Sequence, residues 1–228
     1  MSTADGATSP RERLLQAARD VVATEGLEGL TLRAIARRAG VSHGAPLRHF
    51  PTLAALLAAV AADGFARLIA TVDAALAEAD EVAAARGDRL DARQRLAVAG
   101  QAYVRFALAD PGVFTVTFRP ERVDVNDTGY QMQGFASFLQ LVDLVKAAQL
   151  DGWRAGERPE ELATVLWANV HGVAELTLHG ALPGVVGDDA VDRVLALSTA
   201  VTLDIDPTDI PGLDLTDPRA PTLEGDTR

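Results

Sequence analysis

The residues of this chain best suited to chemistry lie near its C-terminal end, where His171, Glu175 and His179 follow one another at intervals of four. On an α-helix these side chains share one flank, and this spacing could hold a metal ion or position a general base. The adjacent His-Glu pair of the metalloprotease motif is absent. We therefore expect a buried histidine that donates a hydrogen bond, an exposed glutamate and a helix-end histidine, and no metal.

The sequence lacks the residues and motifs that other kinds of enzyme chemistry require. The chain has no cysteine, which excludes disulfides, thiolate metal sites and a cysteine nucleophile. It also lacks a glycine-rich phosphate loop and a nucleophile elbow, and it contains four histidines in all. We expect neither catalysis nor a bound cofactor.

A second group of residues is basic. Residues 29–62 contain four arginines and no Asp or Glu, although the net charge of the whole chain is −11. A locally basic patch on an acidic chain requires an anionic partner, and the phosphate backbone of DNA is the usual one. A helical hairpin with a solvated arginine face is the alternative. The four residues are Arg33, Arg37, Arg38 and Arg48.

The segment that positions these arginines has helix-turn-helix spacing. Thr31 can cap a first helix, and Gly40 suits the left-handed turn that ends it. Ser42 can cap a second helix over residues 43–49. A preceding helix, capped at Ser9 and Pro10 and stopped by Gly26, supports both. The apolar face of the first helix is formed by Leu32, Ile35, Ala36 and Ala39, at helical spacing.

Residues 1–57 resemble the DNA-binding domain of the TetR-type (tetracycline-repressor-like) family of bacterial regulators. The family pattern runs T-x-R-x-I-A-x-x-A-G-V-S and then a short recognition helix ending in an R-H-F-like triplet. The matching residues here are Thr31, Arg33, Ile35, Ala36, Ala39, Gly40, Val41, Ser42, Arg48, His49 and Phe50. The resemblance implies a transcriptional regulator that binds a double-stranded DNA operator. We expect base contacts from His43, Gly44, Ala45 and Arg48, and phosphate contacts from Thr31, Arg33, Ser42 and His49.

Two positions depart from the family pattern. Leu47 stands where the family usually carries a tyrosine, and Leu53 where it usually carries a lysine, and both usual residues are phosphate contacts. Pro46 also removes one backbone donor. Losing such contacts weakens DNA binding and flattens its salt dependence. The alternative function is therefore a helical ligand-binding or metal-binding protein with weakened DNA binding.

The rest of the chain is also predicted to be helical, giving an all-α fold. We expect a long helix over residues 53–80 that is apolar almost all round, a charged loop at 81–88, and helices over 91–110, about 130–150, 159–180 and 190–203. A short helix between 112 and 118 packs Phe114 and Phe118 inward, and Phe135 and Leu139 lie on inner faces of the 130–150 helix. Trp167, His171 and Gly172 resemble the branch of the family labelled by its Trp-His-Gly signature.

The long helix is by sequence the only element that touches both halves of the protein. Gly64 lies inside it and has two interpretations: a pivot that transmits ligand binding to the DNA-binding domain, or a point where a neighbouring helix approaches closely.

The predicted domains are a flexible tail (1–9), the three-helix helix-turn-helix domain (10–57), a helical ligand-binding and dimerisation domain (58–203) and an acidic, disordered tail (204–228). Two helices with surplus apolar surface predict a homodimer. We expect a repressor released from its operator by a mostly apolar small-molecule inducer. The predicted ligand-binding residues are Phe106, Phe114, Phe118, Phe135, Trp167 and His171.

The composition is that of a globular protein, with 48% apolar and 23% charged residues. The N-terminal residues lack the apolar core of a secretory signal, and no apolar run approaches the roughly 20 residues that a membrane span requires. We expect a cytoplasmic protein with no membrane partner.

Overall fold

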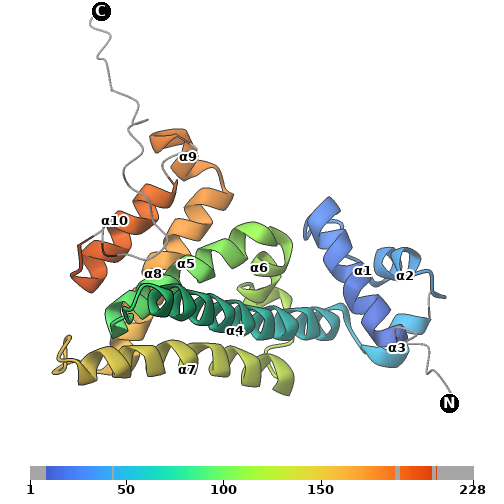
Figure 1. Ribbon diagram of the computed structural model, residues 1–228. Helices are drawn as coiled ribbons and strands as arrows, with labels where there is room; N and C mark the ends of the chain where they lie inside the picture. Colours follow the sequence, from blue (N-terminus) through green and yellow to red (C-terminus); the bar gives the residue numbers. More distant parts are fainter. Residues whose placement is uncertain (1–8, 43, 188–190, 207–208, 210–228) are drawn as a thin grey trace, which may run out of the picture. The chain divides into compact units, whose positions relative to one another are not determined.

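The computed structural model describes residues 9–42, 44–187, 191–206 and 209. Over this part the chain is all-α, as predicted, and contains no β-strand (Figure 1). The helices are α1 (Pro10–Glu25), α2 (Leu32–Arg38), α3 (Ala45–His49), α4 (Leu53–Ala85), α5 (Ala92–Ala109), α6 (Pro111–Thr117), the 3-10 turn η1 (Pro120–Arg122), α7 (Thr128–Leu150), α8 (Pro159–Leu178), α9 (Ala181–Val186) and α10 (Val191–Leu203). His43 and most of both predicted tails lie outside the described residues.

The chain divides into two compact units. The first combines residues 1–71 with 106–140, and the second combines 72–105 with 141–228. Helices α4, α5 and α7 each contribute to both units. The domain boundaries expected from the sequence, including the one at residue 57, stay a prediction.

The first unit begins with the three-helix head, α1 to α3. A capping box starts α1: Glu12 N donates to the Ser9 hydroxyl (3.2 Å), and Ser9 N donates to the Glu12 carboxylate (2.7 Å). The hydrogen bond from Ser9 N to the carboxylate lowers the pKa of Glu12, and the Ser9 hydroxyl adds to this effect. Gly26, with φ of 69°, ends α1 as expected. The helix then packs its buried face, which includes Leu14 and Val21, against α2 and α3.

The turn between α2 and α3 follows the prediction except at its second cap. Ala34 N donates to the Thr31 hydroxyl (3.0 Å), and Gly40 has φ of 65°. Helix α3, however, begins at Ala45 with Gly44 as its N-cap and no side-chain cap. The expected cap at Ser42 was wrong because it would place Pro46 in the fourth helical position, where a backbone N–H is required. Proline is tolerated only in the first turn.

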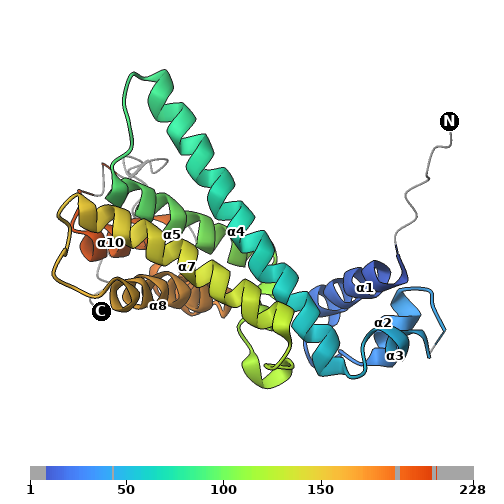
Figure 2. The ribbon, with the colours of Figure 1, turned by 90° about the horizontal axis from the view of Figure 1, so that it is seen from below.

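Helix α4 is longer than predicted, since residues 81–85 are helical and the loop is confined to the residues after Ala85 (Figure 2). By length and composition it could cross a membrane, contrary to the expectation from the sequence. Its charged residues are paired in the first unit: Asp63 with Arg19 (3.3 Å) and Arg67 with Asp110 (3.0 Å). These pairs, and its buried residues, fit the core helix of a globular unit.

Helix α6 packs against both α1 and α4 within the first unit. A Cβ atom at Gly112 would lie 2.8 Å from Val22 Cγ1, and one at Gly64 would collide with the Thr117 hydroxyl. The Arg122 guanidinium donates to the Leu27 carbonyl (3.1 Å), which ties the segment after α6 to the turn after α1. The expectation that α4 alone reaches the head was therefore wrong.

The outer face of α7 also differs from the prediction. Phe135 is 63% exposed and Leu139 is exposed too, whereas Val142 and Val145 on the same helix are buried. A helix with apolar residues on several sides does not reveal from its pattern which side meets the core.

In the second unit α8 packs against α9 and α10 (Figure 1). The segment 181–186, which we had not predicted as helical, forms the short helix α9. The buried residues of this unit include Val145, Ala163, Ala174 and Leu195.

We predict that Gly64→Ala lowers stability, because the added methyl group meets a rigid neighbour. Thr117 is fully buried and its hydroxyl donates to the Val113 carbonyl (2.7 Å), so it cannot move aside freely. Overpacking of this kind costs about 1–3 kcal/mol. Thermal unfolding of the variant measures the loss.

The double variant Gly64→Ala/Thr117→Ala is the control. Removing the hydroxyl should restore part of the melting temperature lost in Gly64→Ala, and the coupling energy of this cycle should be non-zero. A Gly64→Ala protein of unchanged stability that responds less to ligand would instead support the pivot.

Candidate nucleic-acid interface and ligand site

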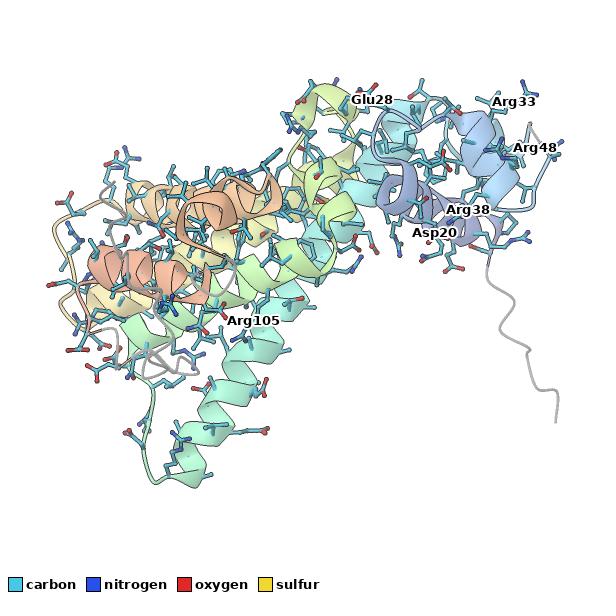
Figure 3. All side chains as sticks on the ribbon, turned by 90° about the horizontal axis from the view of Figure 1, so that it is seen from above. Asp20, Glu28, Arg33, Arg38, Arg48 and Arg105 are labelled. Atoms are coloured by element: carbon cyan, nitrogen blue, oxygen red, sulfur yellow. The ribbon has the colours of Figure 1, made fainter. Side chains whose placement is uncertain are left out.

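The outer face of the head carries the arginines that the sequence singled out. Arg33 on α2 and Arg48 on α3 are exposed, and within the described part of the chain neither forms an ion pair. Figure 3 shows both side chains at the same edge of the head. Their charges are available to a ligand outside the protein.

Some of the other arginines of the head have partners in the protein, and Arg37 does not form an ion pair in its described part. Arg38 lies 3.9 Å from Asp20, and Figure 3 shows the two side by side. Arg11 stacks its guanidinium over the Phe50 ring at 5.2 Å. Arg37 is exposed and, among the described residues, has no ion-pair partner.

The remaining predicted contact residues in and before α3 differ in whether they face the interior or the solvent. Pro46 and Phe50 are buried and form the inner side of α3, while Gly44, Arg48 and His49 are exposed. Ala45 is half-buried. Nothing lies within 4 Å of a Cβ built at Gly44, so the backbone there is open to close approach.

Two further predicted contacts, Thr31 and Ser42, are exposed, and the Thr31 oxygen already accepts the capping hydrogen bond. His43 lies outside the described residues. Of the two departures from the family pattern, Leu47 is exposed and Leu53 is half-buried.

Comparison with protein families decides the identity. Residues 14–60 match the family described as "Bacterial regulatory proteins, tetR family". Residues 96–201 match the family described as "Tetracyclin repressor-like, C-terminal domain".

The chain belongs to the TetR family. It is therefore a DNA-binding transcriptional regulator, and regulators of this family are generally not enzymes.

Solved structures agree with this assignment. A protein of unknown function from Rhodococcus sp. RHA1 is 33% identical, with 89% of this chain and 98% of that chain covered and a TM-score of 0.71. A transcriptional regulator from the same organism is 26% identical, with coverages of 86% and 97% and a TM-score of 0.59. A putative tetR family transcription regulator from Shewanella sp. PV-4 is 16% identical, with coverages of 86% and 97% and a TM-score of 0.63, and it shows the fold alone. No curated protein matches the sequence.

The predicted ligand-binding residues fall into both units. In the first, the Phe114 and Phe118 rings lie 5.0 Å apart, and the Phe118 ring meets Phe65 edge-on at 5.5 Å. Phe106 is buried, with the Arg67 guanidinium 6.0 Å from its ring centre, and Phe135 is exposed. Thus two of the four phenylalanines, Phe114 and Phe118, pack against other aromatic rings, while the role of all four toward a ligand stays a prediction.

In the second unit Trp167 and His171 meet at a residue that we did not single out, Tyr103 on α5. The Trp167 indole N–H donates to the Tyr103 oxygen (3.2 Å), and that hydroxyl lies 2.8 Å from His171 Nδ1. Since its oxygen accepts from Trp167, the Tyr103 hydroxyl can donate its own hydrogen to Nδ1. This arrangement requires a neutral His171 with its hydrogen on Nε2.

Burial sets the protonation of this network. Desolvation raises the pKa of the Tyr103 hydroxyl far above its usual value, so the hydroxyl keeps its proton. Desolvation also lowers the pKa of His171, against a smaller opposing effect of Glu175. Both shifts favour the neutral chain Trp167–Tyr103–His171.

The side chains of His171, Glu175 and His179 are close to one another at the end of α8. Glu175 lies between the two histidines, 3.8 Å from His171 Nε2 and 3.3 Å from His179 Nδ1. No group of three potential ligands that could hold a metal ion occurs among the described residues. His179 Nδ1 also lies 2.8 Å from the Glu175 carbonyl at the end of α8.

The second unit also contains a cavity of about 460 Å³ beside the start of α5 and the turn after α7. It is lined by Asp91, Ala92, Arg93, Asp151, Gly152, Trp153, Arg154 and Asp204. None of the predicted ligand-binding residues belongs to this lining, which is charged where we expected an apolar site.

We predict that His171 makes stability depend on pH. Because its pKa is lowered in the folded protein, its contribution is complete above the ordinary value of 6.5 and is lost as the pH falls below it. The melting-temperature difference between wild type and His171→Gln should therefore shrink from pH 8 to pH 5.

Thr164→Ala is the control, because Thr164 is exposed on the same helix and carries no titratable group, and we expect it to leave the pH dependence of stability unchanged. A His171→Gln profile parallel to that of the wild type would contradict the neutral role of His171.

Proposed function

We propose that this TetR family regulator is a cytoplasmic repressor that binds a near-palindromic operator as a homodimer and is released by a mostly apolar small molecule. The observation that carries the proposal is the pair Arg33 and Arg48, exposed at one edge of the helix-turn-helix and unpaired among the described residues (Figure 3). In this role Arg48 lies in the major groove with His43, Gly44 and Ala45. Thr31, Arg33, Ser42 and His49 hold the phosphates.

The distribution of charge supports this orientation. Residues 10–57 contain seven arginines and four acidic residues, whereas residues 204–228 contain seven acidic residues and two arginines. The head is the basic part of an acidic protein. An anionic duplex is therefore attracted to the head and repelled elsewhere.

Unpaired apolar stripes on α8 and α10 support the homodimer. On α8, Val165 and Leu176 are exposed, and the intervening Ala168 and Gly172 lie at helical spacing on the same side. On α10, Leu197 and Val201 are exposed one turn apart. The two helices pack against each other. Two copies could bury these stripes in a four-helix interface, and exposed apolar patches of this kind mark such interfaces.

We predict that Val201→Glu gives a monomer that loses operator binding, because two half-sites require two linked recognition helices. Val201 is 81% exposed, so the charge disturbs the interface and not the core. Light scattering gives the oligomeric state. Selection from random DNA followed by fluorescence anisotropy gives the operator and its affinity.

Val185→Glu on α9 is the matched control, since Val185 is 83% exposed and lies outside both stripes. It should remain dimeric and bind the selected operator. A wild-type protein that enriches no DNA motif would favour the alternative, a helical ligand-binding or metal-binding protein with weakened DNA binding.

The contacts of α6 support a route from ligand to DNA. Helix α6 touches α1 at Gly112 and α4 at Gly64, and it contains Phe114, one of the predicted ligand-binding residues. A ligand that prefers one position of α6 would therefore bias the position of the head.

The chemistry of the inducer can be tested without knowing its identity. We predict that neutral, apolar compounds raise the melting temperature and lower operator affinity, because the predicted ligand-binding residues of the first unit are apolar rings packed around Phe118. A thermal-shift screen with matched neutral and charged compounds measures this. If only highly charged metabolites stabilise the protein, the inducer is not apolar.

A further inference from the structure

The recognition helix carries one apolar side chain that the protein does not bury. Leu47 is 58% exposed, and it is the only large hydrophobic residue so exposed in the described residues from 9 to 52. The neighbouring Pro46 and Phe50 form the buried side of α3. Leu47 therefore belongs to the outer face of the helix.

Leu47 shares that face with the groups that we expect to meet the bases. Gly44, Leu47 and Arg48 are spaced i, i+3 and i+4, so they lie together on one side of α3. The backbone at Gly44 is open, and Arg48 is unpaired among the described residues. An apolar side chain here lies on a basic surface, next to a cation suited to guanine.

We infer that Leu47 is a specificity-determining residue that reads the C5-methyl group of a thymine in the operator, an inference that rests on the proposed function. In the major groove thymine is the base that presents a methyl group, and apolar side chains recognise it by contact. A leucine cannot replace the phosphate hydrogen bond of a tyrosine. On DNA, the leucine side chain can be removed from water by contact with an apolar group, which is the methyl group of a thymine or the face of a sugar.

The position of Leu47 also restricts where the thymine lies. Leu47 and Arg48 are adjacent, and successive base pairs are about 3.4 Å apart, so the two contacted bases should lie within about two base pairs in each half-site. Arg48 supplies a bidentate contact to guanine, and Leu47 supplies the methyl contact beside it.

The test removes the methyl group from the DNA and the side chain from the protein. Full-length protein is used to select an operator from random duplexes, and each thymine of one half-site is then replaced in turn by deoxyuridine, which lacks only the methyl group. Fluorescence anisotropy measures the dissociation constant of each duplex. For the wild type, one replacement should weaken binding about fourfold, as expected for one buried methyl group.

Variants assign the effect to the side chain. Leu47→Ala should bind the thymine and deoxyuridine duplexes equally, whereas Leu47→Met should keep the methyl effect. Arg48→Ala should keep it too while losing about a 5- to 150-fold preference for a guanine within two base pairs. Met132→Ala, which removes an exposed apolar side chain from α7, is the control and should behave as the wild type.

The outcomes separate the two proposals. Selection that enriches no motif overturns the operator proposal, and this inference falls with it. An enriched operator at which no deoxyuridine weakens the wild type overturns the role of Leu47 alone. So does a Leu47→Ala protein that is folded by circular dichroism and retains the full methyl effect.

Discussion

The close approach of α6 to α1 and α4 is the constraint on which the first unit depends. Gly112 and Gly64 leave no room for a side chain at either contact, because Val22 and the buried Thr117 already occupy that space. Packing this tight transmits displacement, since a helix without free space around it cannot shift without moving its neighbours. Arg122 adds a polar tie from the following segment to Leu27, at the end of the turn after α1. The head is thus held by α4 through the chain and by α6 through side chains.

The parts of this fold that could be predicted are those fixed by local chemistry. Ser9, Thr31, Gly26 and Gly40 each act through their own backbone or the next turn, and each occupies the position expected from the sequence. The start of α3 was misplaced although its cause is also local, since Pro46 cannot occupy the fourth position of a helix. The orientation of α7 could not be predicted, because Phe135 and Val142 differ in burial only through neighbours that are distant in sequence.

The candidate site residues likewise include some that local sequence features indicated and one that depends on contacts distant in sequence. Arg33 and Arg48 were found from charge and spacing, and the structure leaves both exposed. Tyr103 was missed, because nothing in its surrounding pattern distinguishes it from an ordinary core residue. Its hydroxyl contacts Trp167 and His171, which lie 64 and 68 residues away along the chain. This network gives the Trp-His spacing a physical reason: residues four apart on α8 present two ring nitrogens to one hydroxyl group.

The placement of polar groups explains why a protein of net charge −11 can still recognise DNA. Several cations of the head are committed internally, Arg38 to Asp20, Arg19 to Asp63 and Arg11 to the Phe50 ring. These interactions stabilise the head without adding to its outward charge. Four arginines of the head, Arg13, Arg33, Arg37 and Arg48, form no ion pair among the described residues and remain for phosphate, which supplies the salt-dependent attraction common to all DNA sequences. This attraction does not distinguish sequences, and in the function that we propose discrimination depends on the short outer face of α3, where Arg48 and the apolar side chain of Leu47 are adjacent.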